Sequence, residues 1–172
     1  MLYFVSGDIL LSRAHAIAHG VAPNDPMTQG LALALRQKYP SLHKDFHHWC
    51  SQQHPKPGEA WMWGAADGAR IVQLLTQDGG YGAGARPGRA TPQQVRESFR
   101  ALSKLALKEG FTSIAVPRLA TGVGGLAWDD VLPIVEDRLG ALGVPVYVYA
   151  EYRPGKAAHE PGLESAQTPA AG

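Results

Sequence analysis

The chain has 172 residues, of which 45% are hydrophobic and 18% are charged, and its formal net charge is +1. This length suits one soluble globular domain, and the near-neutral charge excludes the broad basic field of a non-specific nucleic-acid binder. No stretch approaches the roughly 18 apolar residues that a membrane span needs, and residues 1–10 carry neither a basic leader nor a cleavable apolar run. The single cysteine, Cys50, cannot form an intrachain disulfide, so we expect a cytoplasmic protein with no membrane partner.

Apolar runs of strand length alternate with helical patterns along the first half of the chain. Prolines and glycines mark the ends of these segments. The predicted elements are, in order, a strand at residues 2–6, a strand at 14–21, a helix at 30–40, a helix at 41–54 and a two-stranded hairpin within 59–77 that turns near Asp67 and Gly68.

The second half continues the alternation. A helix is predicted from Thr91 as N-cap, through Pro92 at the first helical position, to Gly110 as C-cap. It is followed by a strand at residues 113–117, a helix at 128–143 and a strand at 144–152. The pattern is typical of the α/β class with a mixed, partly parallel sheet. Residues 153–172 are rich in Pro, Gly, Ala and Ser without periodicity, so we expect a folded domain at residues 1–152 and a disordered tail.

Two turns each follow a predicted strand and precede a predicted helix. At such positions backbone N–H groups are unpaired and the helix dipole favours an anion. The sequence TGVGG at residues 121–125 has three glycines that let the backbone approach a phosphate, and Asp129 and Asp130 can cap the next helix. Residues 24–35 repeat the arrangement. Either turn could be a plain connection, but two of them could hold a diphosphate from both sides.

Three motifs together resemble the macrodomain family, whose fold binds ADP-ribose. They are VSGDIL at residues 5–10, AIAHGVAPNDPMTQGLALAL at 16–35 and AVPRLATGVGGLAWDDV at 115–131. The chain is most similar to the branch that contains the terminal ADP-ribose protein glycohydrolase and the DNA ADP-ribosyl glycohydrolase antitoxins. The resemblance spans about residues 1–150 and implies a three-layer α/β/α fold with a mixed central sheet.

The resemblance also implies which residues bind the ligand. Asp8 matches the acid that accepts the adenine amino group, beside the Ile9 backbone, although a plain turn aspartate is the alternative. Tyr149 and Tyr152 could stack on adenine or belong to the core. The first binding loop matches Met27, Thr28, Gln29, Gly30 and Leu31, with Thr28 in place of the usual glycine. The diphosphate loop and its flanks match Pro117, Ala120, Thr121, Gly122, Val123, Gly124, Gly125 and Leu126.

The catalytic groups of that branch are not matched. Gln77 stands where the branch has a lysine, and Gly124 stands where the protein-directed enzyme has an aspartate. Gln77 cannot form a Schiff base with the opened ribose, so we expect a lysine-independent route in which the substrate's phosphate holds a water. The candidate catalytic residues are His19, Asn24, Asp25 and Thr28.

His19 is a candidate because an imidazole exchanges a proton near neutral pH. The alternative is a satisfied histidine at a strand end. Asn24 and Asp25 could orient the water or the distal ribose, or they could be a bare turn pair. A Thr28 hydroxyl could contact the ligand, or the loop could simply tolerate the side chain.

Two other groups of residues give weaker evidence for a functional site. His43, His47 and Cys50 share one helix face, but no second ligand cluster completes a zinc site, so we expect no metal and no cofactor. Residues 78–89 lack the ending of a nucleotide P-loop. They are interpreted as a flap, or a solvated loop, in which Arg86 or Arg89 could meet a modified carboxylate or a nucleic-acid phosphate.

The sequence therefore predicts a monomeric ADP-ribosyl hydrolase that removes ADP-ribose, attached through an ester or glycosidic bond, from a protein or nucleic acid. A small stand-alone domain has no partner module to recruit, which favours an enzyme. The missing lysine and loop aspartate favour the alternative, a reader that binds ADP-ribose without catalysis. A phosphatase or deacylase of free ADP-ribose derivatives is a third possibility.

Overall fold

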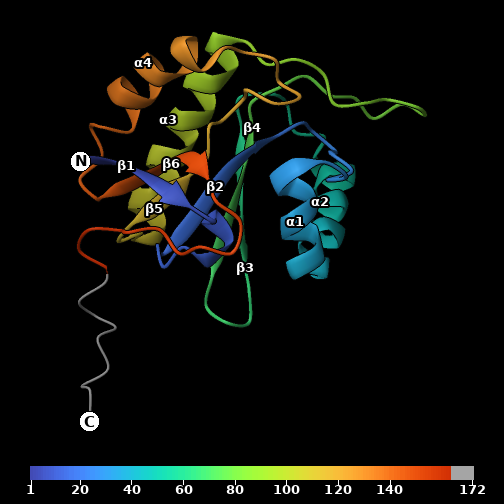
Figure 1. Ribbon diagram of the computed structural model, residues 1–172. Helices are drawn as coiled ribbons and strands as arrows, with labels where there is room; N and C mark the ends of the chain where they lie inside the picture. Colours follow the sequence, from blue (N-terminus) through green and yellow to red (C-terminus); the bar gives the residue numbers. More distant parts are fainter. Residues whose placement is uncertain (164–172) are drawn as a thin grey trace.

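Six strands form one mixed sheet in the computed structural model, which describes residues 1–163 (Figure 1). The strand order is β1-β6-β5-β2-β4-β3, and all neighbours are parallel except the antiparallel pair β3 and β4. The strands are β1 (Leu2–Gly7), β2 (Ala16–Val21), β3 (Ala60–Gly64), β4 (Arg70–Leu75), β5 (Ile114–Val116) and β6 (Val146–Tyr152). The predicted α/β class and the predicted hairpin are confirmed.

Helices cover both faces of the sheet. Figure 1 shows α1 and α2 on one side and α3 and α4 on the other, which gives the expected three layers. The helices are α1 (Gly30–Lys38), α2 (Pro40–Gln53), α3 (Pro92–Glu109) and α4 (Trp128–Arg138), with a short 3-10 helix η1 (Ile9–Leu11) after β1. None of the helices among residues 1–163 has the length and apolar character that crossing a membrane requires.

The ends of the helices follow local chemistry. Thr91 Oγ1 accepts a hydrogen bond from the Gln94 N–H, and the Gln94 side chain accepts one from the Thr91 N–H, so the predicted N-cap of α3 is a capping box. The predicted C-cap Gly110 has φ +67°. The prediction for α4 was too long, because the helix ends at Arg138 and glycines follow at positions 140 and 143.

The sheet is buried on both faces, so successive strand residues enter different cores. Ala18 and Val116 pack under α3 and α4, whereas Ile17 and Ala115 pack on the opposite side against α1 and α2. This is the pattern of a mainly parallel sheet covered by helices. The carboxyl ends of its parallel strands consequently meet at one edge.

Residues 153–163 were predicted to be disordered, but Ala158 and Leu163 pack against the core on the α1 and α2 side of the sheet. Glu160 is only 3% exposed, and its carboxylate accepts hydrogen bonds from Ser12 Oγ at 2.6 Å, the Arg13 N–H at 2.9 Å and the Tyr149 hydroxyl at 2.9 Å. The prediction was wrong here because it relied on the content of Pro, Gly and Ala. Composition does not reveal that a single buried carboxylate, that of Glu160, holds the segment in place. Residues 164–172 of the predicted tail lie outside the described residues.

We predict that Glu160→Ala lowers the free energy of unfolding by about 2–4 kcal/mol, because it leaves three donors without their acceptor. Urea unfolding followed by circular dichroism measures this loss.

Glu151→Ala is the matched control. Glu151 lies in an exposed ion pair with Arg153 at 2.9 Å, and such a pair contributes less than about 1 kcal/mol. Equal losses in the two variants would show that the segment at residues 153–163 does not stabilise the fold.

Candidate functional site

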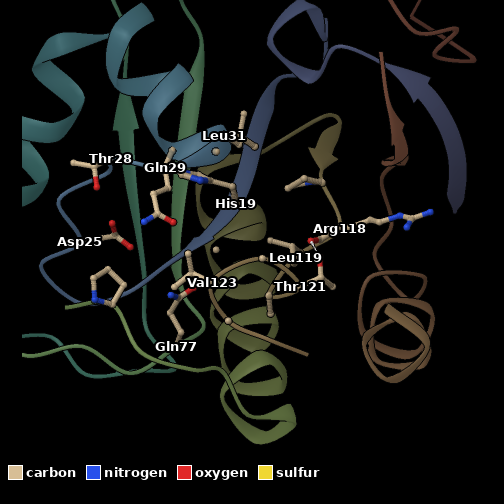
Figure 2. Close-up of a pocket in the computed structure, with 18 of the residues that line it drawn as sticks. His19, Asp25, Thr28, Gln29, Leu31, Gln77, Arg118, Leu119, Thr121 and Val123 are labelled. Carbon is tan, nitrogen blue, oxygen red and sulfur yellow. Dashed lines mark hydrogen bonds between the residues drawn. The ribbon is translucent and has the colours of Figure 1, made fainter. Parts of the chain in front are cut away.

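A cavity of about 1150 Å³ opens where β2 and β5 end. These strands are parallel neighbours, but the chain leaves β2 toward α1 on one face and leaves β5 toward α4 on the other. Diverging connections leave a crevice at the carboxyl edge of an α/β sheet. In Figure 2, Asp25, Thr28 and Gln29 lie on one side of this cavity, and Leu119 and Thr121 lie on the other.

The first binding loop (residues 27–31) and the turn before it at residues 24–26 are shaped by the carboxylate of Asp25. Its Oδ2 accepts from the Ala22 N–H at 2.9 Å and its Oδ1 accepts from the Met27 N–H at 2.8 Å. Asn24 and Met27 both have φ +55°, a conformation that side chains other than glycine rarely adopt. Met27 is fully buried. The loop is therefore held in one shape by its own hydrogen bonds.

This loop leads into α1 without a side-chain cap. The N-cap is Gln29, whose side chain makes no capping hydrogen bond, and Gly30, Leu31 and Ala32 line the cavity. Backbone N–H groups in the first turn of a helix have no partner inside the helix. The start of α1 thus presents donors and the positive end of a helix dipole to the cavity.

The second binding loop, residues 117–126, folds around the carbonyl of Ala120. That oxygen accepts from the Leu126 N–H at 3.0 Å, and a Cβ on Gly124 would lie 2.7 Å from it, so only glycine fits there. A Cβ on Gly122 would meet no atom within 4 Å. Bare backbone therefore faces the cavity.

The predicted caps of α4 are not formed. Its N-cap is Ala127 and has no side-chain hydrogen bond, while Asp129 and Asp130 lie in the first turn. The reason is that α4 begins at Trp128, so the two carboxylates lie two and three positions after the N-cap.

His19 lies at the end of β2, 2% exposed, and lines the cavity. Its Nε2 is hydrogen-bonded to Oε1 of Gln73 on β4. Burial lowers the pKa of His19 to about 4, against smaller opposing effects from Gln73 and Asp25. Desolvation disfavours the charged form of this imidazole, which argues against proton exchange near neutral pH, and the catalytic role of His19 stays a prediction.

Asp8 is tied to the backbone around it. Its Oδ1 accepts from the Leu10 N–H at 3.0 Å and its Oδ2 accepts from the Gly155 N–H at 2.9 Å. Nearby, Tyr149 is 5% exposed with its hydroxyl on Glu160, whereas Tyr152 is 66% exposed at the rim of the cavity. Of the two tyrosines, Tyr152 is therefore the one whose side chain is accessible from the cavity rim.

The flap, residues 78–89, is anchored at several points. Gln77 is 4% exposed, lines the cavity and donates from Nε2 to the Gly88 carbonyl at 3.0 Å. The ring of Tyr81 stacks on His54 with centroids 4.3 Å apart, and its hydroxyl donates to the Pro55 carbonyl at 2.6 Å. These contacts tie the segment to the rest of the fold at Tyr81 and Gly88, and a role as a flap beside the distal ribose stays a prediction.

A family model for the macro domain matches residues 18–135. The chain belongs to the macro domain family. The resemblance seen in the three motifs is thereby confirmed, and both binding loops lie within the matched region.

Named relatives of this macrodomain are glycohydrolases. It is 26% identical over 147 residues to "ADP-ribose glycohydrolase OARD1" of Bos taurus, covering 85% of this chain and 89% of the relative. It is 28% identical over 153 residues to "DNA ADP-ribosyl glycohydrolase" of Thermus aquaticus, covering 87% of this chain but 41% of that relative. The macrodomain therefore spans about two fifths of the length of the second relative.

Solved structures show the same fold. The macrodomain of Thermus aquaticus DarG matches with a TM-score of 0.74 at 25% identity, over 87% of this chain and 98% of that one. Thermosipho africanus DarTG in complex with ADP-ribose matches with a TM-score of 0.75 at 23% identity, over 95% of this chain and 44% of that one.

Most of the predicted site residues line the macrodomain cavity. Those that line it are His19, Asp25, Thr28, Gln29, Gly30, Leu31, Pro117, Ala120, Thr121, Gly122, Val123, Gly124 and Tyr149. Those outside its lining are Asp8, Ile9, Asn24, Met27, Gly125 and Leu126. Their proposed contacts with the ligand stay predictions.

Several lining residues were not predicted as site residues. They are Gly20, Pro26, Ala32, Ala85, Pro87, Arg118, Leu119, Ala150 and Glu151. Most of them are neighbours of a predicted residue or lie within one of the three motifs. Assigning every residue of each loop to the site, and not only the positions that match the family, would have found them. Ala85 and Pro87 carried no signal beyond the glycine-rich composition around them.

The helix-face cluster of α2 does not form a ligand set. His43 and His47 stack with ring centroids 6.1 Å apart, and Cys50 is buried in the core. Across residues 1–163 no group of three or more His, Cys, Asp or Glu side chains is arranged to hold a metal.

The pKa of His19 predicts a loss of stability in acid. The folded pKa of about 4 lies below the ordinary value of 6.5, so between these values the unfolded chain binds more protons than the folded one. Stability present above pH 6.5 is therefore lost as the pH falls toward 4. Urea unfolding should show a contribution from His19 of about 2 kcal/mol between pH 7 and pH 5.

His19→Gln provides the comparison, because the variant lacks this titration. Burial also lowers the pKa of His43, but that effect is common to both proteins. Identical pH dependence in wild type and variant would contradict a buried, neutral His19.

Proposed function

We propose that this macrodomain binds ADP-ribose in the cavity and hydrolyses a bond at C1″ of the distal ribose, releasing ADP-ribose from a modified protein or nucleic acid. The observation that carries the proposal is the convergence of two backbone-lined loops and the open start of α1 on one cavity. Relatives named as ADP-ribose and DNA ADP-ribosyl glycohydrolases support the substrate class.

The diphosphate would lie between the two binding loops. Backbone N–H groups at Gly122 and at the start of α1 suit phosphate oxygens, and neither place carries a side chain that blocks approach. Arg86 and Arg118 also line the cavity and add positive charge at its rim. One chain supplies every wall described, which supports a monomer, and the buried free Cys50 supports a cytoplasmic location.

The adenine would lie toward the ends of β1 and β6. Each oxygen of the Asp8 carboxylate accepts one backbone N–H, and each keeps a further lone pair that could accept from the adenine amino group. Tyr152 would stack on the ring from the exposed rim. Thr28, whose side chain is exposed in the first loop, would contact the ligand through its hydroxyl.

Hydrolysis would add a water to C1″ while the bond from C1″ to the linking oxygen or nitrogen breaks and the leaving atom takes up a proton. Gln77 is an amide and cannot be the nucleophile. With a pKa of about 4, His19 is too weak a base to take the proton of water near neutral pH. The water is therefore held by the substrate's own phosphate, with Asp25 and His19 as polar neighbours.

A binding module without catalysis is the second candidate. It is favoured by Gln77, which occupies the lysine position of the resembling branch and commits its amide N–H to Gly88. A single-turnover assay with glutamate-, serine- and thymidine-linked ADP-ribose and with ADP-ribose 1″-phosphate separates the candidates. Release from any linked substrate supports the hydrolase, release from the phosphate alone supports a phosphatase, and tight binding without release supports the reader.

Gly122→Glu should weaken ADP-ribose binding at least about tenfold, because the new carboxylate repels the diphosphate. A Cβ at this position has open space, so the loop itself should keep its shape. Titration calorimetry measures the affinity.

Gly143→Glu is the control, since its Cβ is equally unhindered and Gly143 does not line the cavity. Gly124 is unsuitable for this test, because its Cβ would collide with the Ala120 carbonyl. Unchanged affinity in Gly122→Glu would mean that the second loop does not hold the diphosphate.

If release is observed, Gln77→Ala should slow it by less than about tenfold, the effect of losing one hydrogen bond that steadies the flap. Gln93→Ala on the exposed start of α3 is the matched control. A complete loss of release in Gln77→Ala, with the fold intact by circular dichroism, would contradict a route that needs no nucleophile at this position.

A further inference from the structure

A buried polar pair joins two strands beneath the cavity. His19 on β2 and Gln73 on β4 are partners in the parallel register, and they are 2% and 0% exposed. Oε1 of Gln73 is hydrogen-bonded to Nε2 of His19, and Nε2 of Gln73 donates to the sulfur of Met27 at 3.3 Å. One amide side chain thus touches both a cavity-lining imidazole and the anchor of the first binding loop.

The partners fix where the hydrogen of the imidazole lies. An amide oxygen only accepts, so the hydrogen must be on Nε2 of His19. Turning the amide of Gln73 around would point its oxygen at the sulfur of Met27, which has no hydrogen to give, and would leave a buried acceptor without a donor. The arrangement therefore selects the Nε2–H tautomer and leaves the lone pair on Nδ1.

We infer that Gln73 is a positioning residue that holds His19 with Nδ1 as a hydrogen-bond acceptor for a ribose hydroxyl and ties Met27, and with it the first binding loop, to the sheet. This inference rests on the proposed function, since it assumes that a ribose enters the cavity. An unprotonated nitrogen attracts an O–H donor and repels a phosphate oxygen. His19 would consequently mark the ribose side of the cavity and the second loop the phosphate side.

Burial keeps this acceptor available. The pKa of His19 is lowered to about 4, so the imidazole stays neutral well below neutral pH. Asp25 is the one charged side chain among the described residues that raises this pKa, and its carboxylate is already engaged with two backbone N–H groups. Within residues 1–163 the hydrogen bond of the His19 ring is made by Nε2, which leaves Nδ1 free for a hydroxyl.

Nitrogen-15 NMR of the full chain tests the tautomer directly, with the His19 signals assigned from their loss in His19→Gln. We expect a single Nε2–H tautomer that does not titrate between pH 5.5 and pH 8. A dominant Nδ1–H tautomer, or titration near pH 6.5, would overturn the inference whether or not the protein binds ADP-ribose.

Gln73→Leu keeps the buried volume and removes both hydrogen bonds. We expect ADP-ribose affinity to fall at least about tenfold at every pH, because the imidazole is no longer held and the first loop loses its tie. Gln73→Glu should behave differently. A buried carboxylate raises the pKa of His19, so Nδ1 gains a proton and affinity should fall at pH 6 and recover toward pH 8.5.

Gln37→Glu and Gln37→Leu are matched controls, since Gln37 is an exposed residue of α1. If wild type binds ADP-ribose and Gln73→Leu binds it as well, the inference fails while the proposed function stands. If wild type does not bind ADP-ribose, the proposed function fails. Should Gln73→Glu not fold, Gln73→Leu and the wild-type NMR still decide the matter.

Discussion

The opposite directions in which the chain leaves β2 and β5 determine where the cavity of this macrodomain lies. Two parallel neighbours that send their connections to different faces cannot close the space between those connections. The first loop, the second loop and the end of β6 all surround that space. The layers of helices on either side follow from the same divergence, because each connection brings its helix to its own face of the sheet.

Carboxylates in this fold mainly organise backbone. Asp25 closes the first loop, Asp8 joins η1 to the segment after β6, and Glu160 holds that segment against Tyr149. Each of these acids accepts at least two hydrogen bonds from within the chain. Acidic residues are easily taken for catalytic groups when only the sequence is known. Here they also set the shape of the backbone around the cavity. A substitution that removes one of them therefore changes the local geometry as well as the charge.

The strands, the four α-helices and the positions of the two loops at the cavity could be predicted from the sequence, because their signals are local. Pro92 and Gly110 bound α3 through their own backbone preferences, and in the second loop Gly124 marks a close backbone approach to the Ala120 carbonyl. The packing of residues 153–163 could not be predicted, since it depends on Glu160 meeting Ser12 from the other end of the chain. The low pKa of His19 depends in the same way on burial by distant elements.

The position of β6 has a consequence for how the protein is made. The last strand lies between the first strand and β5, with Val146 paired to both Leu2 and Ile114. During synthesis on the ribosome, β1 therefore lacks its partner strand β6 until residues through Tyr152 have emerged. Until then the unpaired backbone of β1, which carries the exposed Phe4, can pair with a strand that is not its native partner. Slow translation or early termination before β6 would leave the edges of both β1 and β5 without their shared partner.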